Sequence, residues 1–361
     1  MNGTLVPDAP ALPALADRGG PAQPLLIVDA LRKHFAVAGS LFDRRRQRVH
    51  AVDGVSFVVN KGETLGIVGE SGCGKSTTAR LIARLLPADG GQIVFDGDGV
   101  DQFGGMALKD YRRNLQMVFQ DSFASLNPRL SVLEAIAYGP QVHGLAKAAA
   151  HARAAALLDR VGLAPAQFGA RYPHELSGGQ RQRVNIARAL AFEPRLLILD
   201  EAVAALDKSV QAQVLNLLQE LKAERGLTYL FISHDLHVVH YLADRVLVMY
   251  LGAIVEIGPV ERLYGQPRHP YTRALLAAVP SMDPAHRTER SPLSGDPPNP
   301  IDPPSGCRFR DRCAHAHAAC AAEAPTLRET AAGHWAACHL DDPGSGHPEA
   351  PARVAALARS A

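Results

Sequence analysis

The sequence lacks the features that would place it in a membrane or on nucleic acid. No apolar run approaches the roughly 18 to 20 residues needed to span a bilayer. The formal net charge is only +2, and the longest run of like charge is Arg44 to Arg46, so charge does not indicate a nucleic-acid partner. The N-terminus has no basic region followed by an apolar core, the pattern of a secretory signal. We therefore expect a globular protein that is neither inserted in a membrane nor exported.

Cysteine is also scarce, with five residues in 361. Cys73 stands alone, and the other four lie near the C-terminus, at Cys307, Cys313, Cys320 and Cys338. Such a set can hold a 4Fe–4S cluster or a tetrahedral zinc, or it can form disulfides or stay as free thiols. The spacing lacks the C-x-x-C pairs of zinc ribbons, although three histidines of the same segment could serve as ligands: His315, His317 and His334. The spacing alone leaves these alternatives open.

Changes in composition divide the chain into segments. Residues 1–24 are rich in Ala, Pro and Gly without periodicity, which is typical of a disordered leader. Over residues 25–280, short β-branched runs alternate with helix-like stretches, so we expect an α/β domain with a largely parallel sheet. Residues 281–340 form a loop-rich appendage limited by proline pairs, and residues 341–361 a flexible tail. The expected strands are 25–28, 55–59, 65–68, 196–199, 229–232 and 246–249, and the expected helices 76–86, 148–161 and 181–190.

One glycine-rich stretch has the sequence of a phosphate-binding loop. It matches G-x-x-x-x-G-K-S between an expected strand and an expected helix, the context that the motif requires, and it reads Gly69-Glu70-Ser71-Gly72-Cys73-Gly74-Lys75-Ser76. The glycines let backbone N–H groups surround phosphates, and the helix adds its positive N-terminal end. Lys75 would neutralise the β- and γ-phosphates, and the Ser76 hydroxyl would hold Mg²⁺. We assign this loop, Cys73 included, and the adjoining Thr77 to nucleotide binding.

Two adjacent acids, Asp200 and Glu201, follow the strand-like run 196–199. At the end of a strand, Asp200 can help to hold Mg²⁺, and Glu201 can accept a proton from an attacking water. An acidic pair in this position could also be a solvated turn. The phosphate loop upstream favours the catalytic interpretation.

The string Leu176-Ser177-Gly178-Gly179-Gln180 is identical to the LSGGQ signature of ABC transporter nucleotide-binding domains. It precedes a helix-like stretch, so its backbone amides could face an anion at a helix N-terminus. By these motifs the chain resembles the ABC ATPases over about residues 26–340. In that family the signature of one subunit closes over ATP held by another, which implies that Ser177, Gly178, Gly179 and Gln180 complete the site of a second ATPase subunit.

Three further motifs follow in the family's order. Gln120 is similar to the Q-loop glutamine, Ala205-Leu206-Asp207 to the D-loop, and His234 to the switch histidine. A lone Gln or His after an apolar strand is more often structural, and only the joint arrangement favours function. The resemblance implies that Gln120 senses Mg²⁺ and the transmembrane partner, and that His234 contacts the γ-phosphate and holds the attacking water. Gln120, Glu201 and His234 are thus the predicted catalytic residues.

The adenine base in this family stacks on an aromatic residue after the first strand, and Phe35 is the best-placed candidate. Because residues 36–48 separate it from the next strand, the alternatives are that His50 lies near the base or that Phe35 is an ordinary core residue. The sequence departs from the family after the acidic pair, where Ala202 replaces the commoner proline. Alanine preserves the backbone path, so we expect no loss of catalysis.

Two segments resemble the ATPases that energise dipeptide and oligopeptide importers. Gln120 to Arg129 is similar to the corresponding segment of those ATPases, at the start of residues 121–175, which would form a helical subdomain contacting the membrane partner. His269-Pro270-Tyr271 resembles the motif that opens their C-terminal extension. The same resemblance implies a 4Fe–4S cluster on the four C-terminal cysteines, because ATPases of this family with this cysteine arrangement carry one. Structural disulfides are uncommon in the reducing cytoplasm expected for such an ATPase.

Together these resemblances imply an α/β P-loop ATPase of the ABC type that uses ATP and Mg²⁺ to energise peptide import, peripheral at the cytoplasmic face of the cell membrane. The expected partners are a second, distinct ATPase subunit, two transmembrane permease subunits and an extracytoplasmic solute-binding protein, without nucleic acid. A homodimer is an alternative, as is another solute such as glutathione or nickel. A soluble ABC ATPase acting on nucleic acid or ribosomes would show a coiled-coil insertion or two motif sets, and an exporter ATPase would lack the His-Pro-Tyr segment and the cysteines.

Overall fold

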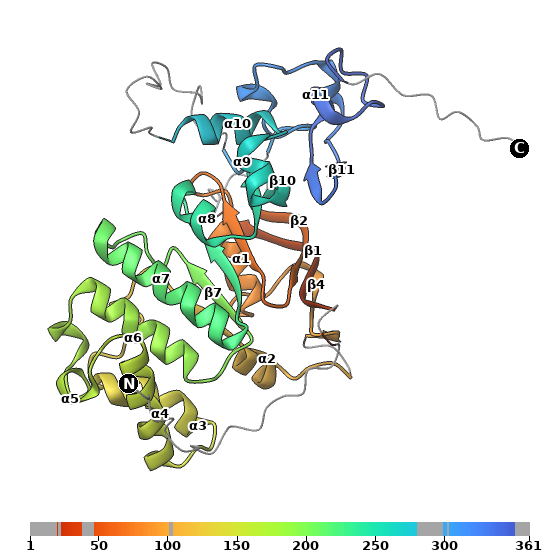
Figure 1. Cartoon of the computed structure of the whole chain (residues 1–361). Helices are drawn as coiled ribbons and strands as arrows, with labels where there is room; N and C mark the ends of the chain where they lie inside the picture. The colour runs from red at the N-terminus through yellow and green to blue at the C-terminus, as the bar shows by residue number, and fades with distance from the viewer. Residues whose placement is uncertain are drawn as a thin grey trace, which may run out of the picture.

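The structure, a computed structural model, describes most of the chain. The described residues are 20, 23–37, 47–100, 104–279, 299–301 and 303–350. Most of the predicted leader over residues 1–24 lies outside them, as do residues 351–361 of the predicted tail. The described part contains a large sheet, a smaller sheet and surrounding helices (Figure 1).

The larger sheet of the described residues consists of β3 Thr64–Val68, β6 Leu115–Val118, β7 Leu196–Asp200, β8 Thr228–Ile232, β9 Arg245–Tyr250, β10 Ala253–Pro259, β11 Arg328–Ala331 and β12 His334–Ala336. Their order is β11-β12-β10-β9-β3-β8-β7-β6. The part from β9 to β6 is parallel, and β10, β12 and β11 extend it in antiparallel pairing. β3, β7 and β8 are buried at every position, as expected for parallel strands covered on both faces. The predicted α/β fold with a largely parallel sheet is confirmed.

The smaller sheet consists of β1 Pro24–Ala36, β2 Arg48–Asn60, β4 Gly90–Phe95 and β5 Asp98–Gly99. All its pairs are antiparallel, in the order β2-β1-β4-β5. β1 and β2 each have 13 residues and form a longer hairpin than the predicted runs 25–28 and 55–59. Phe35 pairs with Val49 in this hairpin.

The helices complete the described structure and leave one prediction to correct. They are α1 Lys75–Ile82, α2 Leu108–Asn114, α3 Val132–Val142, α4 Lys147–Arg160, α5 Pro165–Phe168, α6 Gly178–Leu190, α7 Lys208–Arg225, α8 Leu236–Leu242, α9 Val260–Gly265, α10 Pro270–Ala277 and α11 Ala318–Ala322, with 3₁₀ turns at Pro173–Glu175, Arg310–Arg312 and His339–Asp341. α1 ends at Ile82, whereas the sequence predicted a helix as far as residue 86. Arg84 takes a φ of 53°, a conformation that stops a right-handed helix.

Alternate residues of β7 face two hydrophobic cores. Leu197 and Leu199 join a core that includes buried residues of α3, α4 and α6. Leu196 and Ile198 join a second core shared with α1 and the smaller sheet. This division follows from the two-residue period of a strand, and it anchors the strand end at Asp200 from both sides.

The helices between β6 and α6 stand apart from the sheets in Figure 1. α3 begins with a capping box, in which the Ser131 hydroxyl accepts from the Glu134 N–H and the Glu134 carboxylate accepts from the Ser131 N–H. Ala150, Ala154 and Leu157 of α4 are buried on one helical face. These helices lie within the segment 121–175 that was predicted to form a helical subdomain.

The C-terminal appendage, residues 303–350 of the described part, has little regular structure of its own. β12 pairs with β10 at Glu256 and Ile257, which attaches the appendage to the edge of the larger sheet. Glu256 also accepts hydrogen bonds from the backbone N–H groups of Arg268 and His269 and lies 2.7 Å from Nε2 of the fully buried His334. His347, in the segment predicted as a flexible tail, is buried and its Nε2 lies 2.8 Å from the carbonyl oxygen of His315.

No helix among the described residues combines the length and the apolar character needed to cross a membrane.

Candidate functional site

The phosphate loop connects β3 to α1, and two of its glycines are required by close packing. Gly69 has a φ of 149°, and a Cβ there would lie 2.3 Å from the carbonyl oxygen of Met249. Gly74 has a φ of 108°, and a Cβ there would lie 2.2 Å from the carbonyl oxygen of Ala51. The ends of β9 and of the β1–β2 hairpin therefore press on the loop from two sides and define its path.

Lys75 points back into the loop. Its Nζ donates to the carbonyl oxygens of Gly69 at 2.7 Å and Glu70 at 2.9 Å, and the side chain is buried. Cys73 is also buried, and burial raises the pKa of its thiol. Ser71 and Gly72 are exposed at the turn, and Thr77 is half-buried in the first turn of α1. The loop thus offers a positive charge and exposed backbone at the N-terminal end of a helix, a suitable receptor for phosphates.

Ser76 and Asp200, both predicted to help hold Mg²⁺, lie next to each other. The Ser76 hydroxyl donates to Oδ1 of Asp200 at 2.8 Å. Asp200 is buried at the end of β7, and burial raises its pKa although the Ser76 hydrogen bond opposes that shift. A hydroxyl and a carboxylate at this distance are ligands that Mg²⁺ accepts together with phosphate oxygens.

The three predicted catalytic residues lie together, with Gln120 and His234 both next to the Glu201 carboxylate. Nε2 of Gln120 donates to Oε2 of Glu201 at 2.8 Å, and Nδ1 of His234 lies 3.5 Å from the same oxygen. Gln120, Glu201 and His234 follow β6, β7 and β8, which are neighbours in the parallel sheet, so their strand ends lie at one edge. Glu201 has a φ of 49°, an unusual value for a glutamate, and its N–H donates to Ile232 at 2.9 Å. A carboxylate held in this way can accept a proton from water.

The signature residues lie in a different part of the described chain. Ser177 caps α6, with its hydroxyl accepting from the Gln180 N–H while Gln180 accepts from the Ser177 N–H. Gly178 and Gly179 start α6, and a Cβ on Gly179 would lie 2.3 Å from Val210 of α7. Among the described residues, no hydrogen bond or ion pair joins residues 177–180 to the phosphate loop. One chain therefore holds two separate parts of the predicted ATP site.

The predicted adenine contact, Phe35, lies on β1 and is 38% exposed, so it is available to a planar ligand. Nζ of Lys33 lies 5.6 Å from the centre of its ring. Among the described residues, no cation–π or ring contact joins Phe35 to the phosphate loop.

Beside Phe35 lies a polar cluster that the sequence did not predict. The rings of His34 and His50 stack with centres 4.0 Å apart, and each has a nitrogen near the carboxylate of Asp53, at 3.0 and 3.3 Å. Arg308 of the appendage donates to the same carboxylate. Burial tends to raise the pKa of Asp53, but the hydrogen bonds from Arg308, His50 and His34 outweigh it and lower that pKa to about 2. His34, His50 and Asp53 have the spacing of a metal site, although the Arg308 guanidinium already provides the positive charge.

The phosphate loop also has two partners that sequence reasoning missed. The hydroxyl of Tyr271 on α10 accepts from the Glu70 N–H at 2.8 Å, and Arg312 donates twice to the Glu70 carboxylate. Tyr271 belongs to the His-Pro-Tyr motif, so the motif was a usable signal. Arg312 had no local signal, because its partner lies 242 positions away.

The four C-terminal cysteines converge on one small cavity of the appendage. All are free, and the cavity is lined by Cys307, Cys313, Cys320 and Cys338 together with His339. Burial, with a smaller effect of the neighbouring cysteines, raises the pKa of Cys307 to about 11 and of Cys338 to about 12. The buried Nδ1 of His339 has no hydrogen-bond partner within the described part of the chain. Also within that part, no three of the sulfur atoms come within 4.8 Å of one another.

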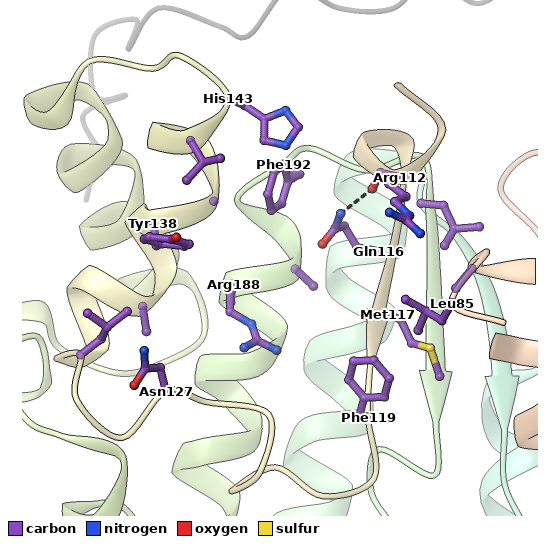
Figure 2. A pocket seen from close by; sticks show the side chains of 17 residues that line it. Leu85, Arg112, Gln116, Met117, Phe119, Asn127, Tyr138, His143, Arg188 and Phe192 are labelled. Atoms are coloured by element: carbon purple, nitrogen blue, oxygen red, sulfur yellow. Dashed lines mark hydrogen bonds between the residues drawn. The ribbon is translucent and has the colours of Figure 1, made fainter. Parts of the chain in front are cut away.

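A groove of about 620 Å³ lies between the helical segment and the sheet. Figure 2 shows Tyr138 of α3 and Arg188 of α6 on one side, with Met117 of β6 and Phe119 on the other. Its rim is apolar and exposed at Leu85, Tyr138 and Val142. Phe119 immediately precedes Gln120, so the groove adjoins the residue that holds Glu201.

Comparison with known proteins agrees with this geometry. The family model of the ABC transporter matches residues 52–204, and that of the oligopeptide/dipeptide transporter C-terminal region matches residues 255–320. The chain is 50% identical over 320 residues to the "Putative peptide import ATP-binding protein" of Brucella ovis, covering 88% of this chain and 98% of the relative. It is 50% identical over 314 residues to the oligopeptide transport ATP-binding protein AppF of Bacillus subtilis, covering 86% and 95%.

A solved structure supports the fold assignment. The structure of cbiO1 from Clostridium perfringens, part of the ABC transporter complex cbiONQ, superposes with a TM-score of 0.57 at 29% identity, covering 67% of this chain and 91% of that one. The predicted ABC-type fold is confirmed. With its paired family models and half-identical relatives, the chain belongs to the dipeptide/oligopeptide importer family of ABC transporter ATP-binding subunits.

Proposed function

We propose that this chain binds and hydrolyses ATP to energise the import of peptides through a membrane permease. The observation that carries the proposal is the convergence of Ser76, Asp200, Gln120, Glu201 and His234 around the phosphate loop. The names of relatives that are half identical over most of their length support peptides as the imported solute.

In this proposal the phosphate loop receives the phosphates of ATP. Lys75 leaves its carbonyl partners in the loop to neutralise the β- and γ-phosphates, and Ser76 and Asp200 hold Mg²⁺. Mg²⁺, when bound, neutralises phosphate charge. Phe35 receives the adenine ring, since its exposed face lies on the hairpin that packs on the loop.

Glu201 is the proposed general base. Its carboxylate takes a proton from the attacking water, and His234 orients that water next to the γ-phosphate. Gln120 occupies the Glu201 carboxylate in this structure, so activation requires the glutamine to release it. The separation of residues 177–180 from the loop supports a second ATPase subunit that brings its own signature to this ATP site.

The groove beside Gln120 is the proposed docking site for a short helix of the permease. Its exposed apolar rim suits an amphipathic helix. Phe119 lines the groove, and the next residue, Gln120, is hydrogen-bonded to Glu201. A docked helix that shifts Phe119 would therefore also shift Gln120 and change its contact with Glu201. On this proposal the chain lies at the cytoplasmic face of the membrane, with a second ATPase subunit and two permease subunits, and a solute-binding protein acts on the other side.

The cysteines are the proposed ligands of a 4Fe–4S cluster, which would tie the appendage together. Their convergence on one cavity, and the unpartnered Nδ1 of His339 beside it, support a bound group. A 4Fe–4S cluster is held by four cysteine thiolates, which is the number of cysteines that line this cavity.

The central test is ATP-driven peptide uptake by vesicles that contain this chain, its partner ATPase, the permease and the binding protein. We expect uptake to stop with Lys75→Ala, while Lys109→Ala, on α2 away from the loop, behaves as the native chain does. Uptake of peptide that continues without a functional phosphate loop in this chain would overturn the proposal.

The cluster has its own test, which is iron and acid-labile sulfide analysis of anaerobically purified protein. We expect about four irons per chain, lost in a Cys313→Ser variant and retained in Cys73→Ser. Zinc in place of iron, or no metal, would contradict the cluster and leave the ATPase proposal intact.

A further inference from the structure

Glu70, the second residue of the phosphate loop, is held at three points. Its N–H donates to the Tyr271 hydroxyl at 2.8 Å, and its carbonyl oxygen accepts from Nζ of Lys75 at 2.9 Å. Its carboxylate accepts two hydrogen bonds from Arg312, from Nη1 at 2.7 Å and from Nη2 at 3.1 Å. Paired charge-assisted bonds fix orientation as well as distance. One residue therefore joins the phosphate lysine to the appendage.

Arg312 is itself held in a buried position. Its side chain is 5% exposed, and its guanidinium lies 6.0 Å from the centre of the Tyr250 ring. Tyr250, Tyr271 and Phe309 form an aromatic cluster with ring centres 4.6 to 5.4 Å apart. Removing one partner of a buried ion pair is costly, because it leaves the other charge unpaired. The aromatic cluster and the ion pair thus hold the same side of the loop.

The arginines around Arg312 point in alternate directions. Arg308 reaches Asp53 and the carbonyl oxygen of Leu251 in the ATPase core. Arg310 turns back and bonds Ser305 within the appendage. Arg312 therefore contacts the phosphate loop and Arg310, two residues away, does not. Arg310 can serve as a matched control for Arg312.

A second part of the C-terminal region also lies against the loop. Asn299 and Pro300 line a cavity of about 310 Å³ together with residues 70–73. The carbonyl oxygen of Pro300 accepts from the His50 N–H at 3.1 Å. The region beyond α10 therefore approaches the nucleotide loop at more than the Arg312 contact.

We propose that Arg312 is a positioning residue for the phosphate loop, acting through Glu70 to keep the loop backbone in the arrangement that receives phosphates. The appendage then sets the affinity of the ATPase core for nucleotide. The inference rests on the proposed function, since it takes this loop to be the ATP site. Arg312 itself does not enter the loop; its effect passes through the Glu70 carboxylate.

The test is equilibrium binding of a fluorescent ATP analogue with Mg²⁺ to the full chain, well below the melting temperature of each variant. Arg312→Gln should weaken affinity about tenfold, a typical size for coupling between two sites. The affinity of Arg312→Lys should lie between those of the native chain and Arg312→Gln, because an ammonium supplies the charge without the paired hydrogen bonds. Arg310→Gln should bind as the native chain does. A tie that only fastens the appendage would lower the melting temperature and leave the affinity unchanged, which would overturn the proposal.

A double-variant comparison tests the route through Glu70. If Arg312 acts through Glu70, the combination of Glu70→Gln with Arg312→Gln should bind no more weakly than Arg312→Gln alone. Losses that add, or an equal loss in Arg310→Gln, would refute the proposed route.

Lys75→Ala separates this inference from the proposed function. If Lys75→Ala abolishes binding while Arg312→Gln binds normally, only the inference fails. If the native chain does not bind the analogue, or Lys75→Ala binds it equally well, both fail.

Discussion

The ATPase core and the C-terminal appendage are stabilised by different kinds of contact. The core is built on strands such as β7 and β8 whose side chains are all buried, between two large apolar clusters. The regular structure of the appendage is limited to two strands of four and three residues and short helical turns within its described part. Its links to the core include ion pairs and buried polar groups at Arg308, Arg312 and His334, beside the β12–β10 pairing and the packing of Phe309 on Tyr250.

The two kinds of contact have different consequences for stability and for local movement. Apolar burial is non-directional and tolerates small shifts, whereas paired charges fix particular atoms at particular distances. A region held by a few such pairs can change its contact with the core without unfolding it. We expect changes in the core to affect turnover or global unfolding, and changes in the appendage to affect local opening and pH response.

The largest effect should come from Glu201→Gln. The amide cannot accept the proton from water, so turnover should fall by about 10²- to 10⁴-fold while nucleotide binding persists. Steady-state ATPase rates of the assembled transporter check this, with the exposed Glu261→Gln as the control. If Glu201→Gln keeps a tenth of the native turnover, Glu201 is not the general base, and the prediction that changes in the core affect turnover is weakened.

Removing core packing should lower global stability. Leu230 is fully buried at the centre of β8, and Leu230→Ala should cost about 2–5 kcal/mol of unfolding free energy. Leu85→Ala, at a half-exposed position, should stay within about 0.5 kcal/mol of native. Denaturant titration measures both. Equal losses would mean that burial does not distinguish these positions.

Glu256 should make the attachment of the appendage sensitive to acid. Burial raises its pKa, but hydrogen bonds from His334 and from the backbone of Arg268 and His269 outweigh this and leave it below 4.5. Because the folded pKa is the lower one, the stabilisation is present above about pH 4.5 and is lost as pH falls through the folded pKa.

Glu256→Gln should therefore cost about 1–3 kcal/mol at neutral pH, since it leaves buried partners poorly matched. Melting temperatures of the native chain and of Glu256→Gln at pH 7 and pH 4 test this. The difference between the two melting temperatures should be smaller at pH 4. A gap that widens on acidification would contradict the sign of the shift.

The smallest effect should come from Arg308→Gln, at about 1 kcal/mol, because the pair with Asp53 is partly open to solvent. The pKa of about 2 keeps Asp53 charged, so the loss should persist from pH 7 to pH 4. Hydrogen exchange of residues 299–313 should report faster local opening, with β7 unaffected. Faster exchange throughout β7 would show that the appendage supports the core globally.

Local patterns made the core predictable and left the appendage contacts out of reach. The apolar runs of β7 and β8, the glycines of the phosphate loop and the Ser177 cap each depend on residues a few positions apart. Glu70 and Arg312 are 242 positions apart, and no periodicity links them. The cluster of His34, His50 and Asp53 was missed for the same reason, because only the β1–β2 hairpin and Arg308 bring it together. The early end of α1 depends on the backbone at Arg84, which composition does not encode.

The attachment of β12 to β10 also affects how the protein behaves in solution. An uncovered edge strand offers unpaired N–H and C=O groups to any other chain, which favours aggregation. Here β12 covers β10 at Glu256 and Ile257, and the short β11 becomes the outer strand. Detaching this hairpin would expose the edge of the seven-residue β10 in place of that of the four-residue β11, so the appendage shortens the free edge at this end of the sheet.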